Sequence, residues 1–451
     1  MKTLIRWLLL SIIILFVSTS ISYSQQQPVT ADSIKAQFLH AWKGYKEYAW
    51  GHDDLKPLSK EAHDWYGETM LLTPVDAYDC MLIMGLKDEA AETKKLIFDS
   101  LNFNKNIEVQ SFEITIRVLG GLISAFFLED DHQFLELAKD LGNRLLPVFN
   151  SKTGMPYRYV NLQTGAIRDS INNPAEIGTA LLEFGMLSKV TGDTMYYTKA
   201  KNALVSLYNH RSSIGLVGTW INVETGEWTD TSSHIGGCID SYYEYLLKAW
   251  VLFGDKECKA MYDEHINAVN QYVADTSQGG LWYGQVGMNS GKRTGTEYGS
   301  LEAFMPAVFA MAGDLERAKQ LQESNFKMWQ LHDIEPEALN YTTMKVTDKR
   351  YILRPEIIES AYYLFQYTGD STYRKMGETF YHSFENYCKV DAGYTSLDDV
   401  ITKVQGNRMH SFFFAETLKY LYLLFAPNDA LRFNKYIFNT EAHPFRKVWE
   451  E

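Results

Sequence analysis

Apolar residues recur along most of the chain at the three- and four-residue steps of amphipathic helices. Residues 177–188 are too dense in apolar side chains for an exposed helix and suit one that faces a neighbour. Strand-like alternation is confined to a few short segments. The pattern predicts an all-α protein. A clear stripe occurs within residues 240–253, where it contains Tyr243, Leu246, Leu247 and Val251.

Turns built on glycine and aspartate interrupt this pattern at regular intervals. Glycine ends a helix by taking the left-handed conformation, and aspartate caps the next helix by accepting its free N–H groups. The repeat predicts helix pairs that close into a double-layered ring, with an open solenoid as the alternative. No Pro- or Ser-rich linker divides the chain, which predicts one domain over residues 25–451. The turns are marked by Asp88, Asp130, Asp193, Asp255, Asp314, Asp370 and Asp429, at steps of 42 to 63 residues.

Residues 1–24 have the features of a secretory signal peptide. Lys2 and Arg6 flank the start of an apolar run that is too short to span a bilayer, and Ser22 and Ser24 supply small residues before a cleavage site. We therefore expect a secreted or periplasmic bacterial protein with no stable membrane insertion after cleavage. An uncleaved anchor is the alternative.

The chain is acidic and poor in cysteine. Its formal net charge of −13 becomes −15 without Lys2 and Arg6. Such a charge argues against nucleic acid or an anionic membrane as a partner and suits a neutral or cationic ligand. The cysteines are too few for a disulfide framework, and an oxidising compartment would allow one bridge of undetermined pairing. They are Cys80, Cys238, Cys258 and Cys388.

Several carboxylates lie where a helix core should be apolar. Burying a charge is costly unless it is paired or bound, so such residues are candidates for chemistry. Glu113 and Arg117 share a helix face, and Pro355 suits the first turn of a helix, which puts Arg354 and Glu356 at its start. Buried ion pairs that hold helices together are the alternative. The set comprises Glu113, Asp240, Glu356, Glu359 and Glu416, and its spread over several helix pairs favours a lined cavity.

These residues fall within segments that resemble glycoside hydrolase family 47, the class I α-1,2-mannosidases. The resemblance covers almost the whole mature length, and its segments follow one another in the order of the family. Each segment alone is moderately specific, and together they are highly specific. The segments are residues 40–55, 76–86, 112–121, 240–247, 353–360, 409–425 and 438–444.

The resemblance implies an (α/α)7 barrel in which a small C-terminal β-hairpin plugs one end. It also implies an inverting, calcium-dependent exo-α-1,2-mannosidase that removes terminal mannose from mannose-rich oligosaccharides or glycoprotein glycans. Thr440 would bind Ca²⁺ through its hydroxyl and carbonyl oxygens, and waters held by carboxylates would complete the shell.

The resemblance also assigns roles residue by residue. Glu113 matches a general acid that acts through a water, Asp240 matches a second acidic group that is the rival acid, and Glu356 matches the general base. A glycosidase needs such a pair, and inversion leaves room for a water between base and sugar. The remaining matches are the sugar-orienting Arg117 and Arg354, the stacking ring of Phe412, and the acidic residues of the site, Glu176, Glu337, Glu359, Glu416 and Glu441.

Two departures from the family leave the preferred leaving group open. Gly299 and Ser300 replace an Asp-His pair of the processing enzymes, which looks more like the glycoprotein-degradation branch, and His410 stands where an acidic residue is usual. A non-catalytic mannose-binding protein on the same scaffold and an α-mannosidase of other linkage preference are the competing hypotheses. The core set of carboxylates and Thr440 is intact, which favours the enzyme.

Overall fold

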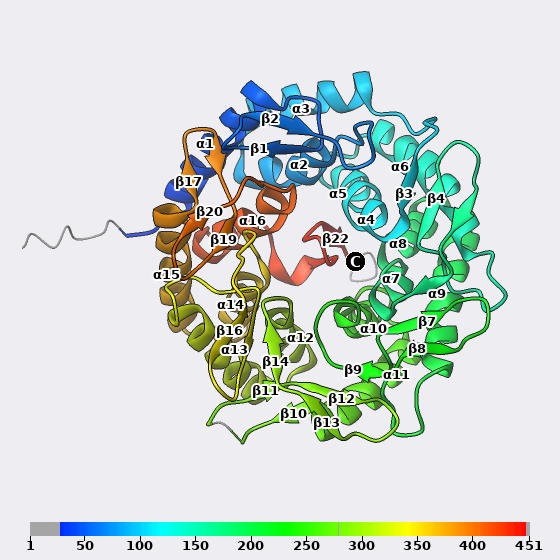
Figure 1. The fold of residues 1–451 in the computed structure, drawn as a ribbon. Helices are drawn as coiled ribbons and strands as arrows, with labels where there is room; N and C mark the ends of the chain where they lie inside the picture. Colours follow the sequence, from blue (N-terminus) through cyan, green and yellow to red (C-terminus); the bar gives the residue numbers. More distant parts are fainter. Residues whose placement is uncertain (1–27, 278, 448–451) are drawn as a thin grey trace, which may run out of the picture.

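A computed structural model describes residues 28–277 and 279–447. Two concentric layers of helices form a closed ring, which confirms the predicted (α/α)7 barrel (Figure 1). The predicted signal peptide lies outside the described residues. The inner layer contains α2 (Leu72–Met84), α5 (Gly120–Glu129), α8 (Leu181–Thr191), α10 (Asp240–Phe253), α12 (Met305–Ala312), α14 (Glu356–Thr368) and α16 (Leu418–Phe425). The outer layer contains α1 (Ala31–Tyr48), α3 (Lys87–Ser100), α6 (His132–Leu145), α9 (Thr194–Asn209), α11 (Lys256–Ala268), α13 (Leu315–Gln330) and α15 (Thr372–Tyr387).

Hydrophobic patterning separates the two layers. Inner helices such as α2 and α8 are buried over most of their length, because neighbours surround them on several sides. Outer helices bury one stripe, as α6 does with Phe134, Leu135, Ala138, Leu141 and Leu145. Short helical turns extend four inner helices at their N-terminal ends: α4 (Ser111–Ile114) with the π-turn Thr115–Leu119, α7 (Pro174–Gly178), the 3₁₀ turn Leu301–Phe304, and the π-turn Phe413–Thr417. A further π-turn, Val269–Val273, ends α11, and 3₁₀ turns occur at Leu146–Phe149 and Phe433–Lys435.

The glycine–aspartate turns connect each inner helix to an outer one. Five inner helices end on a glycine with positive φ: Gly85, Gly192, Gly254, Gly313 and Gly369. Asp193, Asp255 and Asp314 cap the following helices through their side chains, as predicted. Asp131 rather than Asp130 caps α6, because Asp130 itself takes the left-handed conformation.

The last turn does not behave as its sequence predicts, because no long helix follows Asp429 in the described part of the chain. The seventh pair instead joins the two ends of the described chain, where α1 packs against α16. This contact closes the ring and excludes the open solenoid.

Short antiparallel strands lie mainly in the connections that lead from outer helices to inner helices. They are more numerous than the sequence suggests, although each has only two to four residues. The sheets are β1 (Asp54–Lys56) with β2 (Glu61–His63); β3 (Glu108–Gln110), β4 (Tyr159–Asn161) and β5 (Ile167–Arg168); β6 (Ile171–Asn172), β7 (Trp220–Asn222) and β8 (Trp228–Asp230); β9 (Ser232–Ser233), β12 (Gln285–Gly287) and β13 (Arg293–Gly295); β10 (Ala274–Asp275) with β11 (Trp282–Tyr283); β14 (Glu297–Gly299), β15 (Ala338–Asn340) and β16 (Lys345–Asp348); β17 (Lys389–Val390) with β18 (Gly393–Tyr394); and β19 (Leu397–Asp399) with β20 (Val404–Gln405).

The C-terminal hairpin of β21 (Tyr436–Phe438) and β22 (Pro444–Arg446) lies inside the ring, as predicted (Figure 1). Asn439 fixes its loop, because the Asn439 Oδ1 accepts the N–H groups of Glu441 at 2.9 Å and His443 at 2.8 Å. The loop therefore presents Thr440 in a defined position at the bottom of the barrel.

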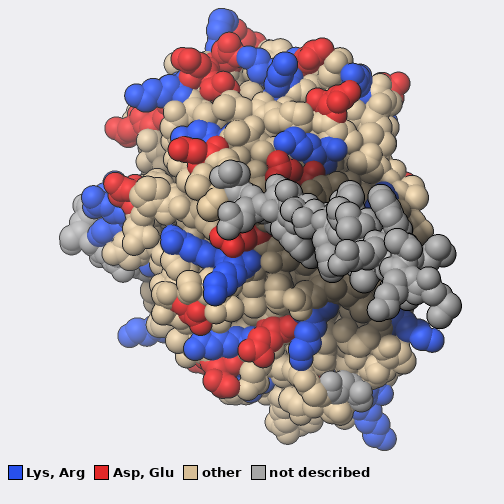
Figure 2. Space-filling view, turned by 90° about the vertical axis from the view of Figure 1, so that its left-hand side faces the viewer, with Lys and Arg blue, Asp and Glu red and all other residues tan. Residues whose placement is uncertain are grey.

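On the face seen in Figure 2, Lys and Arg side chains are interspersed with Asp and Glu rather than gathered into one basic surface. One helical segment among the described residues, Ser111–Glu129, is long and apolar enough to cross a membrane. It belongs to the inner layer and 72% of its most apolar window is buried, which is typical of a core helix.

Candidate active site

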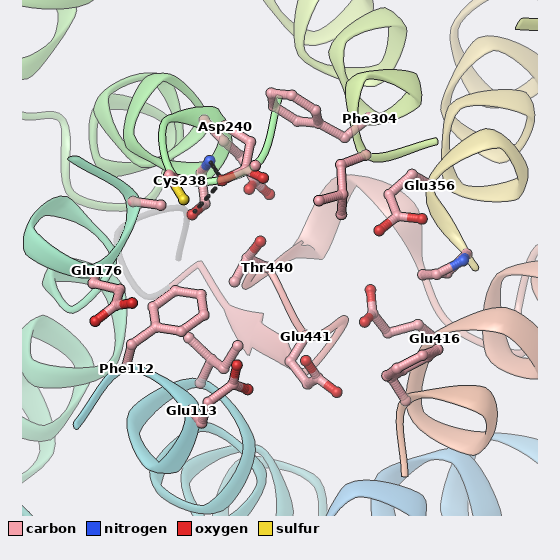
Figure 3. A pocket seen from close by; sticks show the side chains of 18 of the residues that line it. Phe112, Glu113, Glu176, Cys238, Asp240, Phe304, Glu356, Glu416, Thr440 and Glu441 are labelled. Carbon is pink, nitrogen blue, oxygen red and sulfur yellow. Dashed lines mark hydrogen bonds between the residues drawn. The ribbon is translucent and has the colours of Figure 1, made fainter. Parts of the chain in front are cut away.

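The N-terminal ends of the inner helices surround a cavity of about 260 Å³. Thr440 lies at the centre of the surrounding side chains, with Glu113, Asp240, Glu356 and Glu416 around it (Figure 3). Every predicted site residue lines this cavity except Glu337. The complete lining is Gln110, Phe112, Glu113, Ile116, Arg117, Asn173, Ala175, Glu176, Gly237, Cys238, Asp240, Ser241, Glu244, Leu301, Phe304, Arg354, Pro355, Glu356, Glu359, Phe412, Glu416, Thr440 and Glu441.

Helix starts explain why acidic residues collect here. Asp240 and Glu356 are the first residues of α10 and α14, and Glu176 lies in the first turn of α7. The free N–H groups and the positive end of the helix dipole favour negative charge at these positions. Arg354 lies just before its helix as predicted, whereas Pro355 occupies the capping position rather than the first turn.

Arg117 connects the wall of the cavity to the hairpin at its floor. Its Nε and Nη2 atoms each lie 2.9 Å from Oε2 of Glu113, and its Nη1 contacts Glu441. The guanidinium also lies over the rings of Trp65 and Phe412, at 5.3 and 5.8 Å from their centroids. The ion pair holds the Glu113 carboxylate in one orientation, and Phe412 presents a ring to the cavity.

Burial raises the pKa values of the Asp240 and Glu356 carboxyl groups to near neutral pH. Burial raises the pKa of Asp240 to about 7, and the nearby charges of Glu244 and Glu302 add to the shift. Burial likewise raises the pKa of Glu356 to about 7 against the opposing effect of Arg354, whose Nη1 is 3.7 Å from Oε1. The Oε2 of Glu356 has no hydrogen-bond partner in the described structure, so it is free to accept a proton from a water in the cavity.

Other buried carboxyls would give the site a surplus of negative charge if they were ionised. Burial raises the pKa of Glu359 to about 8, and it raises those of Glu416 and Glu441 well above the usual range. Tyr420 donates to Glu359 at 3.1 Å, while Lys248 is engaged in an ion pair with Glu244. Uncompensated buried carboxylates are costly, so this environment fits a bound cation.

The donor set also limits how a cation would be held. No group of three or more His, Cys, Asp or Glu side chains that could ligate a metal occurs in the part of the chain that the structure describes. Direct ligation by the carboxylates is therefore not indicated. The hydroxyl and carbonyl oxygens of Thr440, with waters held by the surrounding carboxylates, agree with the preference of Ca²⁺ for oxygen ligands.

Two predicted residues are held in ion pairs at the edge of the site. Oε2 of Glu337 lies 2.9 Å from Nη2 of Arg354. Oε1 of Glu176 lies 2.9 Å from Nη2 of Arg158 and accepts a hydrogen bond from Asn173 at 2.9 Å. These contacts hold both carboxylates in place.

Sequence reasoning missed a buried charge network beneath the hairpin. His443 lies between Asp76 and Asp79, and Lys419 contacts Asp79 as well, with all four side chains fully buried. Two aspartates three residues apart in an apolar helix were the available signal. It also missed Glu302, a buried carboxyl near Asp240. All four cysteines are free, so the bridge that the sequence allowed is not formed.

A closed-bottomed cavity with two carboxyls poised near neutral pH defines the site of a glycoside hydrolase built on an α/α barrel. The chain belongs to glycosyl hydrolase family 47, whose sequence profile matches residues 37–447.

The relatives agree with this assignment. The chain is 39% identical to α-mannosidase I MNS4 of Arabidopsis thaliana over 433 residues, which cover 91% of this chain and 69% of the plant protein. It is 36% identical to human mannosyl-oligosaccharide 1,2-α-mannosidase IB over 444 residues, or 92% of this chain and 69% of that protein. The structure of the α-1,2-mannosidase from Trichoderma reesei superposes with a TM-score of 0.85 at 29% identity, and covers 92% of this chain and 98% of that one.

Proposed function

We propose that the protein is an inverting exo-α-1,2-mannosidase that removes terminal α-1,2-linked mannose from mannose-rich glycans. The observation that carries the proposal is the cavity that contains Glu113, Asp240 and Glu356 above the hairpin. The hairpin closes its floor, so a sugar chain enters by its end rather than passing through. Relatives that are named α-1,2-mannosidases supply the linkage and the sugar.

In this proposal Glu356 is the general base. Its unpartnered Oε2 takes a proton from a water, which attacks the anomeric carbon on the face opposite the leaving group. Arg354 orients the base, and Arg117 and Phe412 position the terminal sugar.

Two residues compete for the role of general acid. Glu113 is held by Arg117 and would act through a water, as the sequence resemblance implies. Asp240 forms no ion pair in the described structure, and burial raises its pKa to about 7, so a proton is available on it at neutral pH. The leaving-group experiment described in the Discussion separates the two assignments.

The proposal includes Ca²⁺ at Thr440, supported by the surplus of buried carboxyls around that residue. Bound there, Ca²⁺ would compensate buried negative charge and supply coordination sites for sugar hydroxyls. Glu359, Glu416 and Glu441 would hold its waters.

The proposed setting is the periplasm or exterior of a bacterium, which rests on the signal-peptide features of residues 1–24. The partner there is a mannose-containing oligosaccharide or glycoprotein glycan.

Hydrolysis of mannobioses that differ only in linkage tests the activity. We expect release of mannose from the α-1,2 isomer and little from the α-1,3 and α-1,6 isomers, with E356Q as the inactive control. Cleavage of another isomer instead would establish a different linkage preference. Binding of α-1,2-mannobiose without turnover would establish the non-catalytic alternative.

A further inference from the structure

A second cavity, of about 660 Å³, opens beside the active-site cavity between two small sheets. Strands β9, β12 and β13 contribute to one side and β14 and β15 to the other. Gly237 lines both cavities, and Glu337 of the second cavity is paired with Arg354 of the first. The two cavities therefore share a boundary, and we call the second one the acidic groove.

The described residues that line the acidic groove include four carboxylates and neither lysine nor arginine. Glu337 is compensated by Arg354, whereas Asp230, Glu297 and Glu302 form no ion pair within the described structure. Burial lowers the pKa of His234, the one histidine of this lining, to about 4, so this histidine is uncharged at neutral pH. Burial raises the pKa of Glu302 to about 7, so this carboxyl is only partly ionised at neutral pH. The groove therefore carries uncompensated negative charge to which Glu302 contributes in part.

Glu302 lies at the boundary of the two cavities, packed between glycine backbones. A Cβ atom at Gly236 would lie 2.4 Å from Cδ of Glu302, and one at Gly299 would lie 2.8 Å from its Oε2. The Glu302 residue is 7% exposed, and it lines the groove next to Gly237. A larger residue at either position would displace the carboxyl of Glu302. The two glycines therefore leave the space that this carboxyl occupies in the cavity wall.

We propose that the acidic groove receives the aglycone, the part of the substrate beyond the scissile bond, and that it selects against negatively charged aglycones. The inference rests on the proposed function, since it places the terminal mannose in the closed-bottomed cavity. The aglycone must then extend out through the mouth of the active-site cavity, next to which the acidic groove lies. Carboxylates accept hydrogen bonds from sugar hydroxyls and attract ammonium groups, but they repel phosphate, sulfate or carboxylate groups.

Three α-1,2-mannobiosides that differ only in the reducing-end substituent test this selectivity. The substituents are 2-aminoethyl, 2-hydroxyethyl and carboxymethyl, which are cationic, neutral and anionic. At low ionic strength we expect kcat/KM to fall in that order, with a ratio of about fivefold or more between amine and carboxylate. Added salt should reduce the ratio, because it screens charges in an open groove.

Charge-removing variants locate the effect. E302Q and E297Q should each bring the amine-to-carboxylate ratio closer to one. E316Q, on the exposed side of α13, makes the same change in net charge away from the groove and should leave the ratio unchanged. Each ratio is measured within one enzyme, so a general loss of activity cancels. If E302Q does not fold, the ratio measured with E297Q and the salt dependence of the wild-type ratio still show whether the groove causes the selectivity.

The outcomes separate the two proposals. A wild-type ratio near one, with the neutral substrate hydrolysed, overturns the groove assignment and leaves the proposed function standing. A wild-type ratio that both E302Q and E297Q retain places the selectivity on another surface and also overturns it. Failure to hydrolyse any of the three substrates contradicts the proposed function itself.

Discussion

Nδ1 of His443, in the C-terminal hairpin, lies 2.6 Å from Oδ2 of Asp79 in α2, where both side chains are fully buried. Burial alone would lower the pKa of His443, but Asp79 and Asp76 raise it to about 9. The imidazolium is therefore charged at neutral pH. With Lys419, whose Nζ is 2.6 Å from Oδ1 of Asp79, it ties the hairpin to two inner helices.

Asp79→Asn should destabilise the fold strongly. It leaves the charges of His443 and Lys419 buried with too little compensation, which typically costs about 3–5 kcal/mol of the free energy of unfolding. The midpoint of urea unfolding, followed by circular dichroism, measures the change. Asp99→Asn is the control, because its ion pair with Lys95 is exposed and contributes at most about 1 kcal/mol. Equal midpoints for the two variants would contradict the prediction.

Glu356→Gln should lower turnover by roughly 10²–10⁴ while mannoside binding survives. The variant keeps the shape of the side chain and removes the proton acceptor for the attacking water. Steady-state kinetics measure the first effect, and calorimetric titration with a mannoside measures the second. Turnover within a few-fold of the wild type would place the base elsewhere.

Glu113→Gln and Asp240→Asn should respond differently to the leaving group. An activated aryl leaving group needs little protonation, so loss of the acid costs less on an aryl mannoside than on α-1,2-mannobiose. The expected result is that Glu113→Gln shows this relative rescue, provided that the site accepts aryl aglycones. If only Asp240→Asn shows it, Asp240 is the acid and the assignment of Glu113 is wrong.

The first product of hydrolysis should be β-mannose. Attack by a water that Glu356 activates proceeds opposite the leaving group and inverts the anomeric carbon. Proton NMR in the first minutes of reaction, before mutarotation, distinguishes the anomers. An initial α-anomer would indicate a covalent intermediate and a different role for Glu356.

The metal-free protein should lose stability as the pH rises from about 4 to 7. Burial raises the pKa values of Asp240 and Glu356 to about 7, so the folded state binds more protons than the unfolded state in this window. Stability is therefore present below the unfolded pKa values and lost as the pH passes the folded ones, by roughly 3–4 kcal/mol for each group.

Thermal melting after exhaustive chelation, at pH 5 and pH 8, measures this loss. Added Ca²⁺ should raise the melting temperature more at pH 8, because it binds deprotonated surroundings, and it should restore hydrolysis. Full activity in protein shown by elemental analysis to contain no calcium would contradict the proposed cofactor.

Local sequence signals predicted the layers of the fold well, because glycine and aspartate act on the backbone next to them. The turn at Gly254 and Asp255 is an example, with a left-handed glycine and a capping side chain. The pairing of α1 with α16 could not be read in the same way, because it depends on how many helix pairs complete the circle. The sequence also did not show that Asp429 precedes a hairpin inside the barrel, where the repeat predicted another helix.

For the candidate site as well, the sequence identified residues with a local signal and missed residues whose environment comes from distant parts of the chain. Residues such as Glu356 were found because a charge in an apolar segment is conspicuous, and the family resemblance supplied Thr440. Glu302 was missed because part of its environment comes from Gly236, which lies far away in sequence. His443 was missed because its partners lie on α2, far away in sequence.

The contact between α1 and α16 also sets an order of events during synthesis. The first helix of the ring must wait, with its apolar face uncovered, until residues near 425 have left the ribosome. The hairpin that carries Thr440 emerges later still. A nascent chain that lacks α16 and the hairpin therefore has neither a closed ring nor a floor to its cavity, so the ability to bind sugar arises only after both have been made.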